Sequence, residues 1–263
     1  KPDGSVQRPL LDDLNMAAFG IPEWSPDGHK LAFHLLLCRE PRPDCLGGTS
    51  SVRTLDLRTM EMDVIFTSQE FGSRLQWSTD GKSLFAPSID GGWLIGNMDD
   101  SSVTRVVGRA IESYFEVSPD DQQIAYVSGS DVYVADIDGS DETRVYDSFG
   151  TDSTGVAFDV VWRPDGQKIA YATSNPSLNH SIYIVNPDGS NRVELTDYDN
   201  QSRKRLLGWT ADGSQFIYSS DVGQAVWWIE DIYIVNEDGS NLVNLTPNTS
   251  SDDSAADYYV IGD

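Results

Sequence analysis

The chain has 263 residues, of which 39% are hydrophobic, and a formal net charge of −24 at pH 7. This length can bury a substantial core and fits one domain. No stretch is apolar over the length that crosses a bilayer, and a surface of this charge repels nucleic acid and anionic membranes. We therefore exclude nucleic acid as a partner and expect no insertion into a membrane.

A hairpin of one design opens each repeat of the chain. Two β-rich runs flank a Pro-Asp-Gly turn or a close variant of it, as in WSPDGHKLAF from Trp24 to Phe33. Asp-Gly between such runs predicts a tight turn, because Gly tolerates positive φ and Asp caps the turn. Counterparts of Trp24, 40 to 53 residues apart, are Trp77, Val117, Trp162 and Trp209.

A second hairpin with an Asp-Gly-Ser turn follows the first. It is clearest in DVYVADIDGSDETRV from Asp131 and DIYIVNEDGSNLVNLT from Asp231, and Ser181 begins the same pattern. A degenerate version starts at Gly92. The middle strands of the fourth repeat are apolar on both faces, so their sheet must be covered on both sides. The repeats are therefore expected to pack against one another.

Four short strands in each unit and a period in the forties predict an all-β fold, a β-propeller of four-stranded antiparallel blades. We expect a single domain over residues 1–263 with five complete blades, at roughly 21–67, 74–107, 113–147, 157–196 and 205–246. Residues 5–12 match an outer strand and residues 256–262 an inner strand, which predicts an incomplete sixth blade. Closure with five blades is the alternative. Open edge strands associate, so a partner is expected at this seam.

The repeat resembles that of a known family. Its first half reads W-S-P-D-G-x-x-[IL]-A-[FY] and its second I-Y-[IV]-x-N-x-D-G-S-N-x-x-x-L-T, and this pairing resembles the TolB-like propeller repeat over nearly the whole chain. The resemblance implies an extracytoplasmic location (secreted, cell-surface or periplasmic) and a propeller used as a protein-docking platform. A fold of this kind hosts many unrelated activities, so the resemblance specifies the fold better than the function.

The working surface is expected on one rim of the blades. If the strands of a blade are named a to d from the centre outward, turns a–b and c–d lie on one rim, and connections b–c and d–a lie on the other. The turns are alike from blade to blade, whereas the loops vary, and loops on a rigid scaffold usually carry function. The longest b–c loops, at about 34–50 and 219–230, hold the binding candidates His34, Arg39, Trp227 and Trp228. Alternatively, the two tryptophans extend strand c and one packs inward.

No catalytic set is recognisable in the sequence. His29 occupies a turn position, and His34 and His180 lie toward the loop rim without an obvious nucleophile beside them. The chain has no G-x-S-x-G or H-E-x-x-H motif and no glycine-rich phosphate loop. We therefore expect a protein without catalytic residues.

The best candidate for a metal site is weak. Asp136, Asp138 and Asp141 precede or flank a glycine as in the start of a calcium loop, but no bidentate Glu follows at the required distance. A hairpin turn is the favoured reading of this stretch, and calcium is the only cofactor that it suggests.

Two cysteines and four sequons bear on location. Cys38 and Cys45 are expected to form a disulfide, as in a secreted protein; the alternative, in an intracellular one, is free thiols or part of a metal site. Asn-x-Ser/Thr sequons, which matter only where asparagine is glycosylated, occur at Asn179, Asn200, Asn244 and Asn248.

Three functional hypotheses follow. The leading one is a non-enzymatic, extracytoplasmic module that binds proteins, with self-association through the incomplete blade as a variant. The second is a lyase or hydrolase of polysaccharides with an acidic or metal site on the loop rim. The third is the substrate-gating propeller of a larger serine peptidase. The sequence does not identify a small-molecule or glycan ligand.

Overall fold

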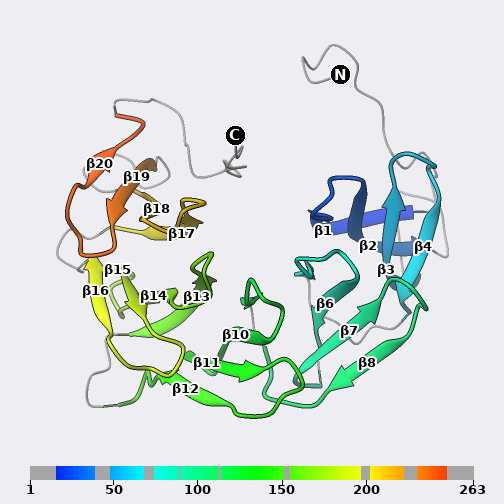
Figure 1. Cartoon of the computed structure of the whole chain (residues 1–263), viewed down its shortest axis with the longest axis horizontal. Coiled ribbons are helices and arrows are strands. Elements are labelled where there is room, and N and C mark those ends of the chain that lie inside the picture. Colours follow the sequence, from blue (N-terminus) through cyan, green and yellow to red (C-terminus); the bar gives the residue numbers. More distant parts are fainter. Residues whose placement is uncertain are drawn as a thin grey trace. The chain divides into compact units, whose positions relative to one another are not determined.

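The computed structural model describes residues 16–38, 48–67, 74–88, 90–111, 114–150, 155–196, 202–221 and 230–247 (Figure 1). These residues form five four-stranded antiparallel sheets, each with its strands in chain order from a to d. The chain divides into two compact units, Lys1–Arg105 and Val106–Asp263. The fold class is that of a β-propeller, as the sequence predicts.

Unit 1 holds the first two blades, and β8 ends one residue beyond its boundary. The strands of blade 1 are β1 (Met16–Trp24), β2 (Lys30–Cys38), β3 (Gly48–Asp56) and β4 (Met62–Phe66). Those of blade 2 are β5 (Gln76–Trp77), β6 (Ser83–Pro87), β7 (Trp93–Asn97) and β8 (Val103–Val106).

Unit 2 holds the other three blades. Blade 3 contains β9 (Phe115–Val117), β10 (Gln123–Ser128), β11 (Asp131–Asp136) and β12 (Thr143–Tyr146). Blade 4 contains β13 (Val156–Trp162), β14 (Ile169–Ser174), β15 (His180–Val185) and β16 (Val193–Thr196). Blade 5 contains β17 (Lys204–Trp209), β18 (Gln215–Ser220), β19 (Asp231–Asn236) and β20 (Val243–Asn244).

Directly paired tyrosines explain the Ala-Tyr and Ile-Tyr elements of the repeat. In each blade of unit 2, a tyrosine of strand b stands opposite a tyrosine of strand c, and the two rings stack with centroids 5.3 to 5.6 Å apart. The pairs are Tyr126–Tyr133, Tyr171–Tyr183 and Tyr218–Tyr233. Facing aromatic pairs of this kind stabilise a sheet.

Proline and glycine of successive a–b turns bring neighbouring blades together. A Cβ added to Gly81 would lie 3.6 Å from the ring of Pro26, and one added to Gly213 would lie 3.8 Å from the ring of Pro164. Gly166 stands in the same relation to Pro119. The repeated glycine thus provides both a positive φ and room for the preceding blade.

Tryptophan side chains fasten some blades to the blade before. The indole Nε1 of Trp77 donates to the carbonyl of Glu23 over 3.2 Å, and that of Trp162 donates to the carbonyl of Glu116 over 3.0 Å. Both indole rings are buried. A side chain at the end of one inner strand thereby reaches the inner strand of the preceding blade.

Strand b of the first blade is longer than the sequence predicts. We expected it to end at Phe33, but β2 continues to Cys38 and pairs along its full length with β3. The apolar run from Leu35 to Leu37 extends the strand, because its backbone finds partners on both sides. The b–c loop is therefore shorter than expected. The incomplete sixth blade lies outside the described residues, and these residues contain no helix suited to span a membrane.

Two glycines with nearly the same φ allow a test of how closely the backbone packs at the start of blade 4. Gly155 and Gly208 have φ of +132° and +136°. A Cβ at Gly155 would lie 2.3 Å from the carbonyl oxygen of Ser174, whereas one at Gly208 would meet nothing within 4 Å. Both alanine variants carry backbone strain of about 1–3 kcal/mol. In urea unfolding, Gly155→Ala should cost at least about 1 kcal/mol more than Gly208→Ala, and equal losses would contradict the close approach.

Candidate functional site

The four binding candidates from the sequence lie in different settings. His34 is 0% exposed within β2, so it does not present its side chain on the loop rim as expected. The reason is the extension of β2, which places His34 opposite Val52 inside the sheet. Arg39, Trp227 and Trp228 lie outside the described residues. Between blades 4 and 5, the structure describes the strand ends on the loop rim and the b–c connection of blade 4, but not residues 197–201 and 222–229.

His180 joins the loop ends of these two blades. Its backbone N–H donates to the carbonyl of Ser202, and its Nδ1 lies 2.9 Å from both the backbone nitrogen and the carbonyl oxygen of Lys204. The ring also packs against Phe158, with centroids 4.6 Å apart. Burial lowers the pKa of His180, which favours the neutral imidazole. The side chain therefore serves as a link between β15 and the start of β17.

Lys204 contributes to the same link through its side chain. Its side chain is buried, and its ammonium donates to the carbonyl of His180 and to Ser202 Oγ, each over 2.8 Å. Ser202 is itself only 1% exposed. A buried lysine in a network of this kind fixes the backbone around it. The neighbouring Arg203 is positioned by Asp221, whose carboxylate accepts its backbone N–H over 2.6 Å.

Arg205 follows this network in the chain, and its side chain is exposed to solvent. Its side chain is 61% exposed, and its Nε lies 3.6 Å from an oxygen of Glu230, which is buried and accepts a hydrogen bond from Ser219. Residues 203–205 are the only adjacent basic residues in the whole sequence. The start of β17 thus exposes the positive charge of Arg205 beside a hydrogen-bonded network, in a strongly acidic chain.

Exposed apolar side chains accompany it on the loop ends of blades 3 and 4. Phe149, Val156 and Leu178 are 88%, 48% and 62% exposed. Phe149 follows strand d of blade 3, Val156 begins β13, and Leu178 lies between β14 and β15. We use the name loop-rim patch for Phe149, Val156, Leu178 and Arg205, which share exposure and a position at the loop-rim ends of blades 3, 4 and 5. These side chains offer apolar contacts and one positive charge. The imidazole of His180, the hydroxyl of Ser202 and the ammonium of Lys204 instead hold strands together.

The acidic hairpin proposed as a weak metal site is bonded within its own turn. Asp138 accepts the backbone N–H and the hydroxyl of Ser140, and Asp136 accepts the side-chain amide of Gln123. Asp141 has a φ of +51° in the same turn. Across the described ranges, no three His, Cys, Asp or Glu side chains gather closely enough to share a metal ion.

The cysteines and sequons are only partly described. Cys38 ends β2 opposite Gly48, and Cys45 falls outside the described residues, as do Asn200 and Asn248. Asn179 lies between β14 and β15 and is half-buried. Asn244 donates to Asp231 and to the hydroxyl of Tyr233, so its amide has a structural role in strand d of blade 5.

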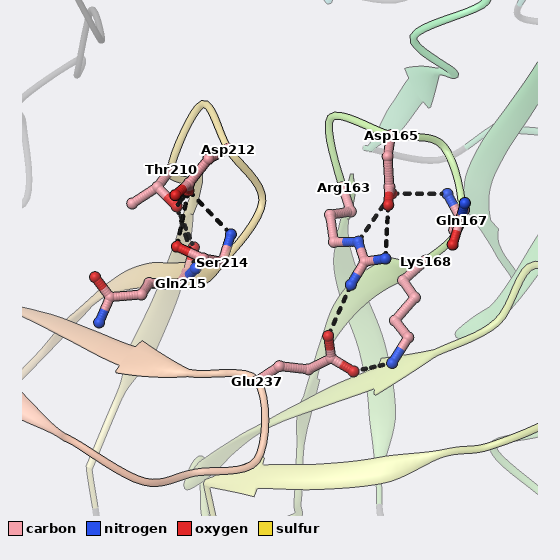
Figure 2. A network of polar contacts seen from close by, with 9 residues as sticks. All are labelled: Arg163, Asp165, Gln167, Lys168, Thr210, Asp212, Ser214, Gln215 and Glu237. Atoms are coloured by element: carbon pink, nitrogen blue, oxygen red, sulfur yellow. Dashed lines mark hydrogen bonds and ion pairs between the residues drawn. The ribbon is translucent and has the colours of Figure 1, made fainter.

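A second polar network, on the turn rim between blades 4 and 5, is not anticipated from the sequence (Figure 2). The guanidinium of Arg163 binds both oxygens of Asp165 and one oxygen of Glu237, and Lys168 binds the other oxygen of Glu237. In the four other blades the position of Arg163 is Ser or Thr. This departure from the repeat is the signal that could have identified the network.

The hydroxyl residue has a local task in the other turns. Thr210 donates to Asp212 over 2.6 Å and accepts the backbone N–H of Gln215, and Ser25 and Ser78 act in the same way. The hydrogen bonds from Thr210 and Ser214 lower the pKa of Asp212 to about 2. Asp212 therefore carries a full negative charge at neutral pH.

Comparison with known proteins places this fold among propellers. Residues 69–204, just over half of the chain, match the family model of the dipeptidyl peptidase IV (DPP IV) N-terminal region. No curated protein matches the chain in sequence.

Three similar solved structures differ in what they do. An oligogalacturonate lyase in complex with manganese has a TM-score of 0.71 and 14% identity, and the match covers 89% of this chain and 67% of the lyase. TolB from Acinetobacter baumannii has a TM-score of 0.58 and 19% identity, with 90% and 56% covered. A protein from Bacteroides ovatus assigned as a dipeptidyl aminopeptidase IV has a TM-score of 0.58 and 12% identity, with 90% and 42% covered. The chain thus spans about half of the latter two proteins.

The link made by His180 predicts a loss of stability in mild acid. Because its pKa is lowered on folding, the unfolded chain takes up this proton first. The contribution of His180 is complete above its ordinary pKa of about 6.5 and is lost as the pH falls below that value. The nearby charges of Lys204, Arg203 and Asp221 are common to wild type and variant. As the pH is lowered through this range, the urea midpoint of unfolding should fall more steeply for the wild type than for His180→Asn. Parallel curves of midpoint against pH for the two proteins would contradict the link.

The turn-rim network predicts an unequal effect of two substitutions at one position. Arg163→Ala removes the contacts to Asp165 and Glu237 and leaves the turn without a hydroxyl. Arg163→Ser also loses Glu237, but it can rebuild the Ser–Asp hydrogen bonds of the other turns. In urea unfolding, Arg163→Ser should therefore be more stable than Arg163→Ala by about 1 kcal/mol. Equal stabilities would show that the hydroxyl has no such role.

Proposed function

Because the chain belongs to the family of dipeptidyl peptidase IV N-terminal regions, we propose that it is a non-catalytic propeller module that binds a polypeptide. The proposed binding surface is the loop-rim patch of unit 2. The observation that carries this proposal is the difference between the buried polar groups and the exposed side chains of that rim. Among the described residues of that rim, the buried polar groups of His180, Ser202 and Lys204 bond to one another and to backbone, while the exposed side chains include three apolar ones and an arginine.

Such a surface is better suited to binding a peptide than to catalysing a reaction. Loops on rigid strands that present aromatic, aliphatic and arginine side chains are typical of protein interfaces. A catalytic role would need a nucleophile or an acid–base pair that faces a substrate. Here the neutral imidazole of His180 and the hydroxyl of Ser202 are occupied in joining β15 to β17. The likeness of the fold to TolB supports the same reading and an extracytoplasmic location.

A second surface supports association at the expected seam of blade 1. The tryptophans that end strand a of blades 2, 4 and 5 are buried, whereas Trp24 of blade 1 is 43% exposed and Ile21 is 74% exposed. An inner strand with an exposed indole is suited to cover by a further strand or by another copy of the chain. Self-association through the incomplete blade is therefore part of the proposal.

The family favours a second candidate function, the substrate-gating propeller of a larger serine peptidase. The matching model is named for the N-terminal region of such an enzyme, and the chain spans 42% of the dipeptidyl aminopeptidase IV that it resembles. The two candidates share a polypeptide ligand. The complete coding sequence distinguishes them, because a gating propeller would be followed by a hydrolase domain with a nucleophilic serine.

Peptide selection against the purified chain tests the leading proposal. Peptides from a random displayed library should bind the wild type, and the double substitution Phe149→Ser and Leu178→Ser should weaken that binding at least tenfold, because it removes exposed apolar contacts. Val243→Ser is the matched control, since Val243 is 49% exposed on the outer strand of blade 5. Equal binding by all three proteins would refute a role for the loop rim. Cleavage of a polyuronate in the presence of manganese would instead favour the lyase hypothesis.

A further inference from the structure

A crevice lies between the a–b turns of blades 1 and 2, within unit 1. Its volume is about 450 Å³, within the range of about 300–1,000 Å³ that is usual for small-ligand sites. Blade 1 contributes Asp27 and Lys30 to its lining, and blade 2 contributes Asp80, Lys82, Met98 and Asp99. The crevice is on the turn rim, so it is separate from the loop-rim patch.

The corresponding place between blades 4 and 5 is filled by a side chain of the protein itself. Arg163 stands at the position of Ser25, and its side chain is only 15% exposed. It reaches across to blade 5, where its Cγ would be 3.2 Å from a Cβ on Gly213 and its guanidinium binds Glu237 (Figure 2). Asp165, which matches Asp27, binds the same guanidinium through two oxygens.

Blades 1 and 2 keep this frame but lack the side chain that fills it. The contact between Pro26 and Gly81 repeats the one between Pro164 and Gly213, so the two turns approach each other in the same way. Ser25 turns its hydroxyl into its own turn, where it donates to Asp27 and accepts the N–H of Lys30. A short side chain therefore takes the place of one that spans the gap.

The charges of the two sites match once a cation is added to the crevice. Between blades 4 and 5, Arg163 and Lys168 face Asp165 and Glu237. Between blades 1 and 2, Lys30 takes the position of Lys168 and Met98 takes that of Glu237, with Asp99 as the next residue. The crevice lining thus holds three aspartates, Asp27, Asp80 and Asp99, and two lysines, Lys30 and Lys82.

Lys82, which lines the crevice, and Arg58 each lie near one of these aspartates, so with both counted the net charge is close to that of Asp99 and Lys30 alone. Lys82 lies 3.8 Å from Asp80, and Arg58 lies 3.9 Å from Asp27, with all four side chains more than half exposed. Exposed pairs at such distances contribute little. One further cation with a long, partly apolar stem would complete the arrangement seen in blades 4 and 5.

We propose that this crevice binds an arginine side chain of a partner polypeptide, seated as Arg163 is seated between blades 4 and 5. The guanidinium pairs with Asp27 and Asp99, since a planar fork of donors suits carboxylates, and its alkyl stem lies against Met98. The net charge of −24 attracts a basic partner toward the site. Failure of this site would leave the proposed function of the loop rim intact.

Nuclear magnetic resonance of methionine methyl groups in the full chain tests the proposal. The chain has four methionines, and Met98 lines the crevice. Titration with arginine blocked at both ends should shift the Met98 methyl resonance in a saturable manner and leave those of Met60 and Met62 in place. Blocked citrulline, which has the same shape without the charge, should produce at most a small shift. An unmoved Met98 resonance, or equal shifts with both probes, would overturn the proposal.

Variants separate the crevice from general attraction to an acidic protein. Asp27→Asn and Asp99→Asn should each weaken binding of blocked arginine about two- to fivefold, as expected for exposed ion pairs. Asp63→Asn is the matched control, because it removes one exposed carboxylate of blade 1 outside the crevice and should leave binding unchanged. Equal weakening by all three would refute a specific site.

Ser25→Arg should fill the crevice from within. Its guanidinium can pair with Asp27 as Arg163 pairs with Asp165, so the folded variant should no longer bind blocked arginine. Unchanged binding by a folded Ser25→Arg protein would overturn the proposal, and the two asparagine variants decide the matter if Ser25→Arg does not fold.

Discussion

Within each unit, a proline ring of one a–b turn lies next to a glycine in the a–b turn of the following blade. Pro26 and Gly81 make this contact in unit 1, and Pro164 and Gly213 make it in unit 2. A Cβ on either glycine would already touch the proline ring, at 3.6 or 3.8 Å, so the space there is limited, and the positive φ also disfavours a side chain. The tryptophan hydrogen bonds between blades, the turn-rim network and the crevice depend on this spacing. The Asp-Gly motif is therefore a packing element between blades as well as a hairpin signal.

The blades could be predicted because their turns are local. Asp-Gly fixes a turn within four residues, and repetition of the motif reveals how many sheets the chain makes. The end of β2 could not be predicted in this way, because His34 and the residues after it become strand only where β3 offers hydrogen-bond partners. Strand ends depend on pairing across loops, and a single sequence without periodic polar residues does not specify that pairing.

The candidate sites were predictable to a smaller extent. The loop position of His180 follows from the repeat, but its link to Lys204 is made with backbone 24 residues away, which no local pattern records. Arg163 is visible as a departure from Ser or Thr at one repeat position. Its partner Glu237 lies 74 residues further along the chain, so the network required the structure. In both cases the sequence indicates an unusual residue and the fold supplies its partner.

The same turns bear on how this protein ages chemically. Asp-Gly bonds are the usual places where an aspartate rearranges to isoaspartate, through attack of the following amide nitrogen on the carboxyl carbon. Here that nitrogen is already bonded back to the start of the turn, as in Gly28 to Ser25 and Gly213 to Thr210. The carboxylate of Asp212 stays ionised and held by hydroxyl groups, which makes it a poor electrophile. A chain with several Asp-Gly bonds can thus resist this rearrangement through the hydrogen bonds of its own turns.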